Sequence, residues 1–139
     1  MGNNLIIRNY TSDDRDQVIG LWEACRLIVQ GNDPYKDIEL KMEFQPELFF
    51  VASLDDKIVG TVMTGYDGHR GYLNYLGIHP MYRSKGYGKS LVEFSVHKLK
   101  ELRCPKLNIQ IRNTNTGVTG FYQKLGFTDH EVKGMQMRL

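Results

Sequence analysis

The order of strand and helix patterns along this sequence predicts an α/β fold built on a mixed, mostly antiparallel sheet. Three strand-like segments separated by short turns occupy residues 48–78, which is typical of antiparallel hairpins. A helix and a further strand follow, and a crossover of this kind makes its two strands parallel. Two more helices precede the hairpins. The expected order is β-α-α-β-β-β-α-β-α-β, with helices on both faces of the sheet.

The first part of the chain predicts one strand and two helices. Residues 5–8 are a short apolar run, and Thr11 follows as an N-cap with acidic residues behind it. Apolar residues then recur at helical spacing, which predicts a helix to about Val29. Pro34 suits the first turn of a second helix that runs to about Phe44.

The remaining elements follow from turn residues and periodicity. They are strands at 48–53, 58–66 and 72–78, a helix ending near residue 102, a strand at 107–111, a short helix at 117–125 and a final strand from Phe127.

Composition and charge favour one globular domain spanning residues 1–139. The chain is 41% hydrophobic and 24% charged, and its 18 basic and 16 acidic residues leave a net charge of +2. So balanced a chain has no general attraction to nucleic acid or membranes. Cys25 and Cys104 lack metal-ligand spacing, so we expect no metal, and Cys25 reads as a buried, inert thiol. With no signal-like or membrane-spanning segment, the expected location is the cytoplasm.

A glycine-rich bend between a strand and a helix predicts an anion site. The first amides of a helix lack intrahelical acceptors and carry the positive end of the helix dipole. Glycines at 86 and 88 let the backbone curl around a phosphate, and Arg83, Lys85 and Lys89 add positive charge. By itself this bend is equally compatible with a basic turn that only begins a helix.

Two nucleotide motifs fail at this bend. A P-loop needs glycine five residues before Gly88, where the chain has Arg83. A dinucleotide fingerprint needs glycine at position 91, which is leucine, and an acidic residue about 20 residues later, which is missing.

The motifs that remain resemble those of the GNAT N-acetyltransferase superfamily. Residues 83–88, Arg-Ser-Lys-Gly-Tyr-Gly, resemble its pyrophosphate-binding segment, and residues 75–80 resemble the central strand and the turn that precede it. Asn115, Tyr122, Lys124 and the Gly-Phe pair at 126–127 resemble its second signature. The resemblance covers residues 5–138, and details at residues 32–38 and 65–71 are most similar to the small YpeA-type branch.

This resemblance implies the ligand, acetyl-coenzyme A (acetyl-CoA), and the residues that hold it. The fourth and fifth strands would splay apart, with pantetheine bonding the backbone between them. The Ile78 amide would donate to the thioester carbonyl, and Tyr122 would protonate the leaving thiolate; core packing is the competing role for Tyr122. The implied CoA-binding residues are Leu76, Gly77, Ile78, Arg83, Ser84, Lys85, Gly86, Tyr87, Gly88, Lys89, Asn115 and Tyr122.

Several assignments stay open at this point. Asn115 either bonds pantetheine or caps the short helix. The general base is one of His69, Asp67, Tyr75 and Glu43, or a water chain.

Three polar residues, Asn32, Asp33 and Asp37, stand between the first two helices, where helix capping is favoured over binding of a cationic amine.

The resulting hypothesis is an N-acetyltransferase that moves an acetyl group from acetyl-CoA to a primary amine of a small molecule or peptide, by direct attack in a ternary complex. The alternative is a non-catalytic module that binds acyl-CoA. The acceptor, the oligomeric state (including a homodimer through the C-terminal strand) and strict use of acetyl over other acyl groups stay open.

Overall fold

A computed structural model describes residues 4–139 of the chain. By its contacts the chain divides into two compact units, Met1–Ile109 and Gln110–Leu139. They are described separately below, and the single domain expected across residues 1–139 stays a prediction.

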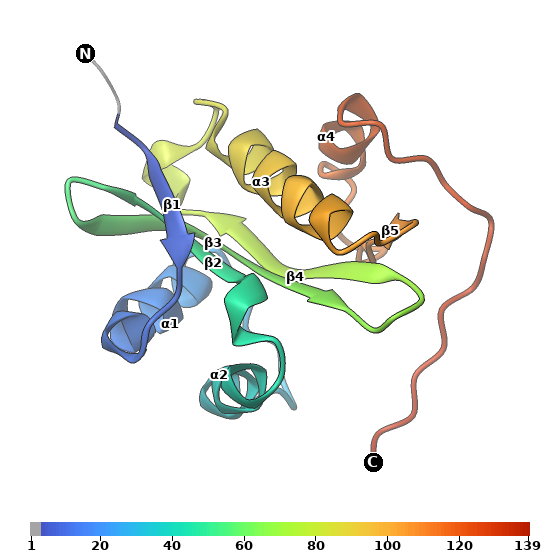
Figure 1. Cartoon of the computed structure of the whole chain (residues 1–139), viewed down its shortest axis with the longest axis horizontal. Coiled ribbons are helices and arrows are strands. Elements are labelled where there is room, and N and C mark those ends of the chain that lie inside the picture. The colour runs from blue at the N-terminus through green and yellow to red at the C-terminus, as the bar shows by residue number, and fades with distance from the viewer. Residues whose placement is uncertain (1–3) are drawn as a thin grey trace. The chain divides into compact units, whose positions relative to one another are not determined.

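The first unit is built on a five-stranded mixed sheet with strand order β1-β2-β3-β4-β5 (Figure 1). The strands β1 to β4 pair antiparallel, and β4 pairs with β5 in parallel, as predicted. Their bounds are β1 Ile6–Asn9, β2 Phe49–Leu54, β3 Lys57–Tyr66, β4 Gly71–Ile78 and β5 Leu107–Asn108.

Helices cover both faces of this sheet, which confirms the predicted layers. Helices α1 (Arg15–Ala24) and α2 (Pro34–Glu43) lie on one face, and α3 (Tyr87–Glu101) lies on the other (Figure 1). Because residues alternate along β2, Phe49 packs in the core beneath α1 while Phe50 meets Phe94 of α3 edge-on. The second unit contains one helix, α4 (Thr119–Lys124), among its described residues.

The first helix ends earlier than the sequence predicts, at Ala24 instead of about Val29. Arg26 adopts a left-handed backbone with φ 57°. The Leu27 amide then donates back to the Trp22 carbonyl at 2.9 Å, which satisfies a terminal helix carbonyl. Helical spacing of apolar residues continues past this point, because the segment still packs against the core.

The prediction of a final strand from Phe127 is wrong, since residues 127–139 form no strand in the described structure. The strand expected at 107–111 is likewise reduced to β5. Alternating apolar residues favour an extended backbone, but a strand also needs a paired neighbour. A β5 of two residues offers little edge to pair with.

A bulge interrupts β4 at its centre. Thr61 pairs with Gly77 and Met63 pairs with Asn74, so β4 has one residue more than β3 between these pairs. Tyr75 lies in this interval with a left-handed φ of 52°. Such a conformation costs a non-glycine residue about 1–2 kcal/mol, so the surrounding structure must hold it in place.

Three groups fix Tyr75 in this conformation. The Trp22 indole N–H donates to Thr61 Oγ1, and that hydroxyl donates to the Tyr75 carbonyl, both at 2.9 Å. The rings of Trp22 and Tyr75 stack with centroids 3.7 Å apart. At the far end of the side chain, the Tyr75 hydroxyl donates to Asp37 Oδ2 at 2.6 Å.

We expect Thr61→Val to lower the free energy of unfolding by about 1–3 kcal/mol, because it leaves the buried Trp22 N–H without an acceptor. Urea unfolding followed by circular dichroism measures this change, because Trp22 is the single tryptophan of the chain and one of the variants below removes it. The double variant Trp22→Phe/Thr61→Val also removes the stranded donor. The double variant should lose less free energy of unfolding than the sum of the losses in Trp22→Phe and Thr61→Val alone. Strictly additive losses would contradict the described relay.

Candidate functional site

Over its second half, the outer edge of β4, called the open edge below, pairs with no strand of the described residues. The parallel pairing with β5 covers only Gly71 and Tyr72, which face Leu107 and Asn108. The residues of β4 after Tyr72 therefore lie beyond the last pair. This agrees with the predicted divergence of these two strands.

The open edge carries backbone donors at the end of β4. His79 donates its amide to the Val59 carbonyl at 2.8 Å, on the β3 side. Alternate residues of a strand direct their N–H groups to opposite neighbours. The amides of Ile78 and Leu76 therefore point to the edge that β5 leaves open.

Gly77 serves packing at this point of the strand. A β-carbon there would lie 2.8 Å from Leu27 Cδ1 and 3.2 Å from Cys25 Sγ. The bulge itself is at Tyr75, and side chains of the segment after α1 account for the glycine at position 77.

Two side chains hold the Ile78 carbonyl. Arg83 Nε donates to it at 3.0 Å, and Cys25 Sγ donates at 3.3 Å. Burial raises the pKa of the Cys25 thiol, so it stays protonated at neutral pH, as expected of an inert thiol. Arg83 is thereby placed at the end of β4 and is not a freely solvated charge.

The predicted glycine-rich bend follows Arg83 in the chain. Ser84 and Gly86 both have left-handed backbones, with φ 64° and 85°, and α3 begins at Tyr87. The prediction that Gly88 also helps the backbone curl is wrong, because Gly88 lies inside the first turn of α3. Ser84 takes this role instead.

The N-terminus of α3 differs from that of α2 in its capping. At α2, Asp33 Oδ1 accepts from the amides of Tyr35 and Lys36 at 3.0 and 3.3 Å, which confirms the predicted cap. At α3 the N-cap is Gly86, which makes no side-chain cap, and the first turn has no acidic residue. The first amides of α3 therefore face outward with the positive end of the helix dipole.

Cations surround this helix end. Lys85 and Lys89 are exposed, and neither forms an ion pair within residues 4–139. Uncapped amides and unpaired cations together fit a phosphate group.

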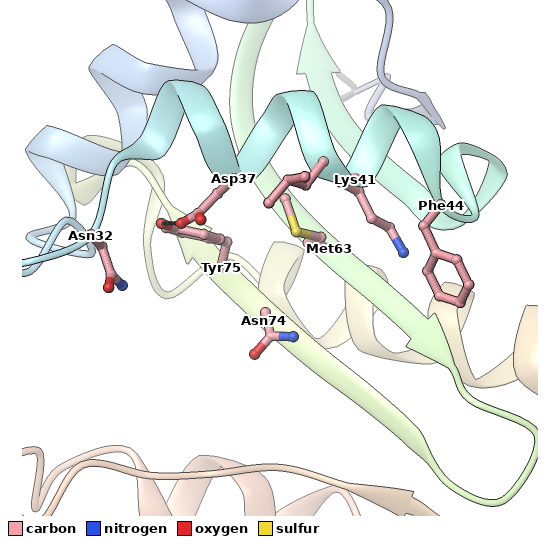
Figure 2. Close-up of a pocket in the computed structure, with 8 residues that line it drawn as sticks. Asn32, Asp37, Lys41, Phe44, Met63, Asn74 and Tyr75 are labelled. Atoms are coloured by element: carbon pink, nitrogen blue, oxygen red, sulfur yellow. Dashed lines mark hydrogen bonds between the residues drawn. The ribbon is translucent and has the colours of Figure 1, made fainter. Parts of the chain in front are cut away.

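A pocket of about 430 Å³ opens between α2 and the strands β3 and β4, and Figure 2 shows its lining. Charged, amide and phenol groups share it with apolar side chains. The lining residues are Asn32, Asp37, Leu40, Lys41, Phe44, Met63, Asn74 and Tyr75.

The charged groups of the pocket are anchored to the sheet. The Tyr75 hydroxyl donates to Asp37. Burial is the larger cause and this hydrogen bond the second cause that raise the pKa of Tyr75 far above its usual range, so the phenol stays protonated. Lys41 donates its ammonium to the Thr64 carbonyl, and burial lowers the pKa of Lys41.

The second unit places Tyr122 on α4 between two aromatic rings. Its centroid lies 5.1 Å from that of Phe121 and 5.4 Å from that of Phe127, both edge-on. Burial raises the pKa of Tyr122, which keeps it protonated at neutral pH. Asn115 does not cap α4, whose N-cap is Val118, so the capping alternative for Asn115 is wrong.

Two of the predicted base candidates belong to a turn. Asp67 Oδ1 accepts from the amides of His69 and Arg70 at 2.8 and 2.7 Å, and these bonds lower the pKa of Asp67. Both residues are exposed, and His69 contributes its backbone to the turn. His79 caps a short 3-10 turn by accepting from the Met81 amide.

The sequence also matches a protein family. Residues 13–127 match the pattern described as the Acetyltransferase (GNAT) family. The chain belongs to the GNAT acetyltransferase family. It is 47% identical over 133 residues to a curated acetyltransferase of Yersinia pestis (strain Pestoides F), covering 96% of this chain and 94% of that protein. An acetyltransferase of Pectobacterium atrosepticum is 46% identical over 121 residues, covering 87% and 86%.

Solved structures show the same GNAT fold at low sequence identity. AAC(6')-Iy in complex with the bisubstrate analog CoA-S-monomethyl-acetylneamine superposes with a TM-score of 0.79 at 19% identity, covering 98% of this chain and 99% of that one. The ribosomal-protein-S18-alanine N-acetyltransferase of Escherichia coli gives a TM-score of 0.76 at 18% identity, covering 89% and 77%. At these identities the likeness establishes the fold.

Sequence reasoning about this GNAT protein missed part of the pocket. It named Asp37 and Tyr75 singly, in different roles, and did not name Lys41. The spacing of Asp37 and Lys41 by four residues would have placed both on one face of α2. No group of three or more His, Cys, Asp or Glu residues that could hold a metal ion occurs within residues 4–139. Over the same residues, no helix has the length and hydropathy of a membrane span.

Proposed function

We propose that this GNAT protein is an N-acetyltransferase that moves an acetyl group from acetyl-CoA to a primary amine by direct attack in a ternary complex. The main support is the uncapped start of α3, which directly follows a left-handed bend in the chain and comes after the open edge of β4. The family supports acetyl transfer, and a location in the cytoplasm is part of the proposal.

The bend is proposed to bind the pyrophosphate of CoA. Amides from Arg83 to Lys89 would donate to its oxygens, and Lys85 and Lys89 would supply countercharge. Ser84 and Gly86 shape this backbone through their left-handed conformations. Arg83 would keep Nε on the Ile78 carbonyl, leaving its two terminal nitrogens for phosphate.

The open edge of β4 is proposed to bind pantetheine as an added strand, through the backbone at Leu76 and Ile78. The Ile78 amide would then donate to the thioester carbonyl as negative charge develops on its oxygen. A preorganised donor of this kind contributes roughly 3 kcal/mol to transition-state stabilisation. The Arg83 and Cys25 bonds to the Ile78 carbonyl fix the next peptide group, between Ile78 and His79, and so hold the end of β4 beside this donor.

Tyr122 is proposed as the general acid. The amine, once deprotonated, attacks the thioester carbon, the C–S bond breaks, and the CoA thiolate takes a proton from the phenol. Water then returns a proton to Tyr122 and removes the extra proton from the amide nitrogen. The support is the position of Tyr122 in the second family signature. Burial raises the pKa of its phenol, which keeps the proton in place but makes the phenol a weaker acid. Asn115 of the same signature is proposed to bond pantetheine.

We expect CoA to raise the melting temperature of the purified protein. At 100 times its Kd, CoA should stabilise the fold by about 2.7 kcal/mol. Calorimetry should give a several-fold weaker CoA Kd for Lys85→Gln and Lys89→Gln, with the difference shrinking at high salt. Lys100→Gln, at the other end of α3, is the matched control. Equal binding of ATP and CoA, or no binding of CoA, would refute the proposed ligand.

We expect Tyr122→Phe to lower kcat about 10²–10⁴-fold while the Kd for acetyl-CoA stays nearly unchanged, because only the proton donor is lost. Release of free CoA thiol across a panel of amines measures turnover. Tyr35→Phe, at an exposed position of α2, is the control. Unchanged turnover would remove Tyr122 from the chemistry. CoA binding without turnover on any amine would favour a non-catalytic acyl-CoA module.

A further inference from the structure

The pocket beside α2 holds two opposite charges that do not neutralise each other. Asp37 and Lys41 are four residues apart, so both lie on one face of α2, where such pairs often bond. Here each side chain bonds the sheet instead. Asp37 accepts from Tyr75 on β4, and Lys41 donates to the Thr64 carbonyl on β3.

Lys41 keeps unused donors in the pocket. An ammonium has three N–H donors, and the Thr64 carbonyl takes one of them. No ion pair to Lys41 occurs within residues 4–139, although the side chain is half-buried. Glu47 acts on the Lys41 charge from a distance without forming an ion pair. A half-buried cation that lacks a direct ion pair favours an anionic ligand group.

The strand register orders the two charges relative to the open end of β4. Tyr75, the partner of Asp37, lies three residues before Ile78. Thr64, the partner of Lys41, pairs with Leu73, two residues further from that end. A ligand that bridges both charges would therefore have its cationic end nearer Ile78 and its anionic end further away.

Apolar side chains lie along the same pocket. Met63, which is buried, lines the pocket, and Figure 2 labels it together with Phe44. Leu40 and Phe44 line the pocket as well, although both are largely exposed. These groups would contact the hydrocarbon part of a small ligand.

We propose that the acceptor is a small apolar amino carboxylate whose amine lies at Asp37 and Tyr75 and whose carboxylate pairs with Lys41. This inference rests on the proposed function and adds the class of acceptor to it. The bound ammonium loses a proton to water before attack, and the acetyl group then passes from sulfur to nitrogen. Lys41 acts as a specificity residue that never touches the reacting atoms.

The test compares L-leucine with L-leucinamide as acceptors, using release of CoA thiol with acetyl-CoA. The carboxamide lacks the charge that Lys41 would bind, and its amine loses its proton more readily. The informative quantity is therefore the ratio of the two kcat/KM values in each variant. We expect Lys41→Met to lower the leucine-to-leucinamide ratio at least 10-fold, mainly through the KM for leucine, and Lys41→Arg to retain most of it.

Lys36→Met on the same helix is the matched control, because Lys36 is exposed and pairs with Glu39. An unchanged KM for acetyl-CoA in Lys41→Met shows that the variant is folded. If that variant fails to fold, calorimetry on the wild-type protein with bound CoA compares its affinity for leucine with its affinity for leucinamide, and the inference predicts tighter binding of leucine. Equal affinities there, or an unchanged ratio in folded Lys41→Met, would overturn the inference. Turnover confined to polyamines or peptides would overturn it as well and leave the proposed acetyltransferase standing. Turnover on no amine would instead count against the proposed function.

Discussion

The hydrogen-bond relay from Trp22 through Thr61 to the Tyr75 carbonyl is the constraint on which the site depends. It holds a non-glycine residue in a left-handed conformation in the middle of β4, a partly buried strand. The resulting bulge shifts the register of β4 by one residue. A one-residue shift exchanges the faces to which side chains point and the edges to which amides point. The bulge therefore determines the direction of the Ile78 amide as well as the position of the Tyr75 phenol.

This geometry divides β4 between two proposed tasks. Its outer edge, beyond the pairing with β5, presents backbone donors for a thioester and its pantetheine arm. Its α2-facing side directs the Tyr75 hydroxyl to Asp37 at the head of the pocket. The start of α3 follows within ten residues of Ile78 and offers uncapped amides for a diphosphate. One strand and the bend after it thus bring the proposed donor and acceptor sites together.

The sequence predicted those features that local chemistry determines. Asp33 before Pro34 predicted a capped helix, Gly86 predicted a bend, and hairpin spacing predicted the antiparallel strands, all of which are confirmed. The left-handed conformations of Tyr75 and Ser84 were not predicted, because neither residue type prefers them. At Tyr75 the distant contacts with Trp22, Thr61 and Asp37 hold the conformation. The final strand was predicted in error, since alternation cannot show whether a neighbour is available for pairing. The roles of Tyr122 and Asn115 came from the family resemblance and stay predictions.

The most direct test of the central claim is a titration of isotope-labelled protein with CoA, followed by amide ¹H–¹⁵N NMR. The account predicts that the largest shifts fall on the amides of residues 84–89 and on Ile78, and that Lys36 on α2 is unaffected. Shifts confined to other parts of the chain, or none at saturating CoA, would contradict the assignment of a diphosphate to the start of α3.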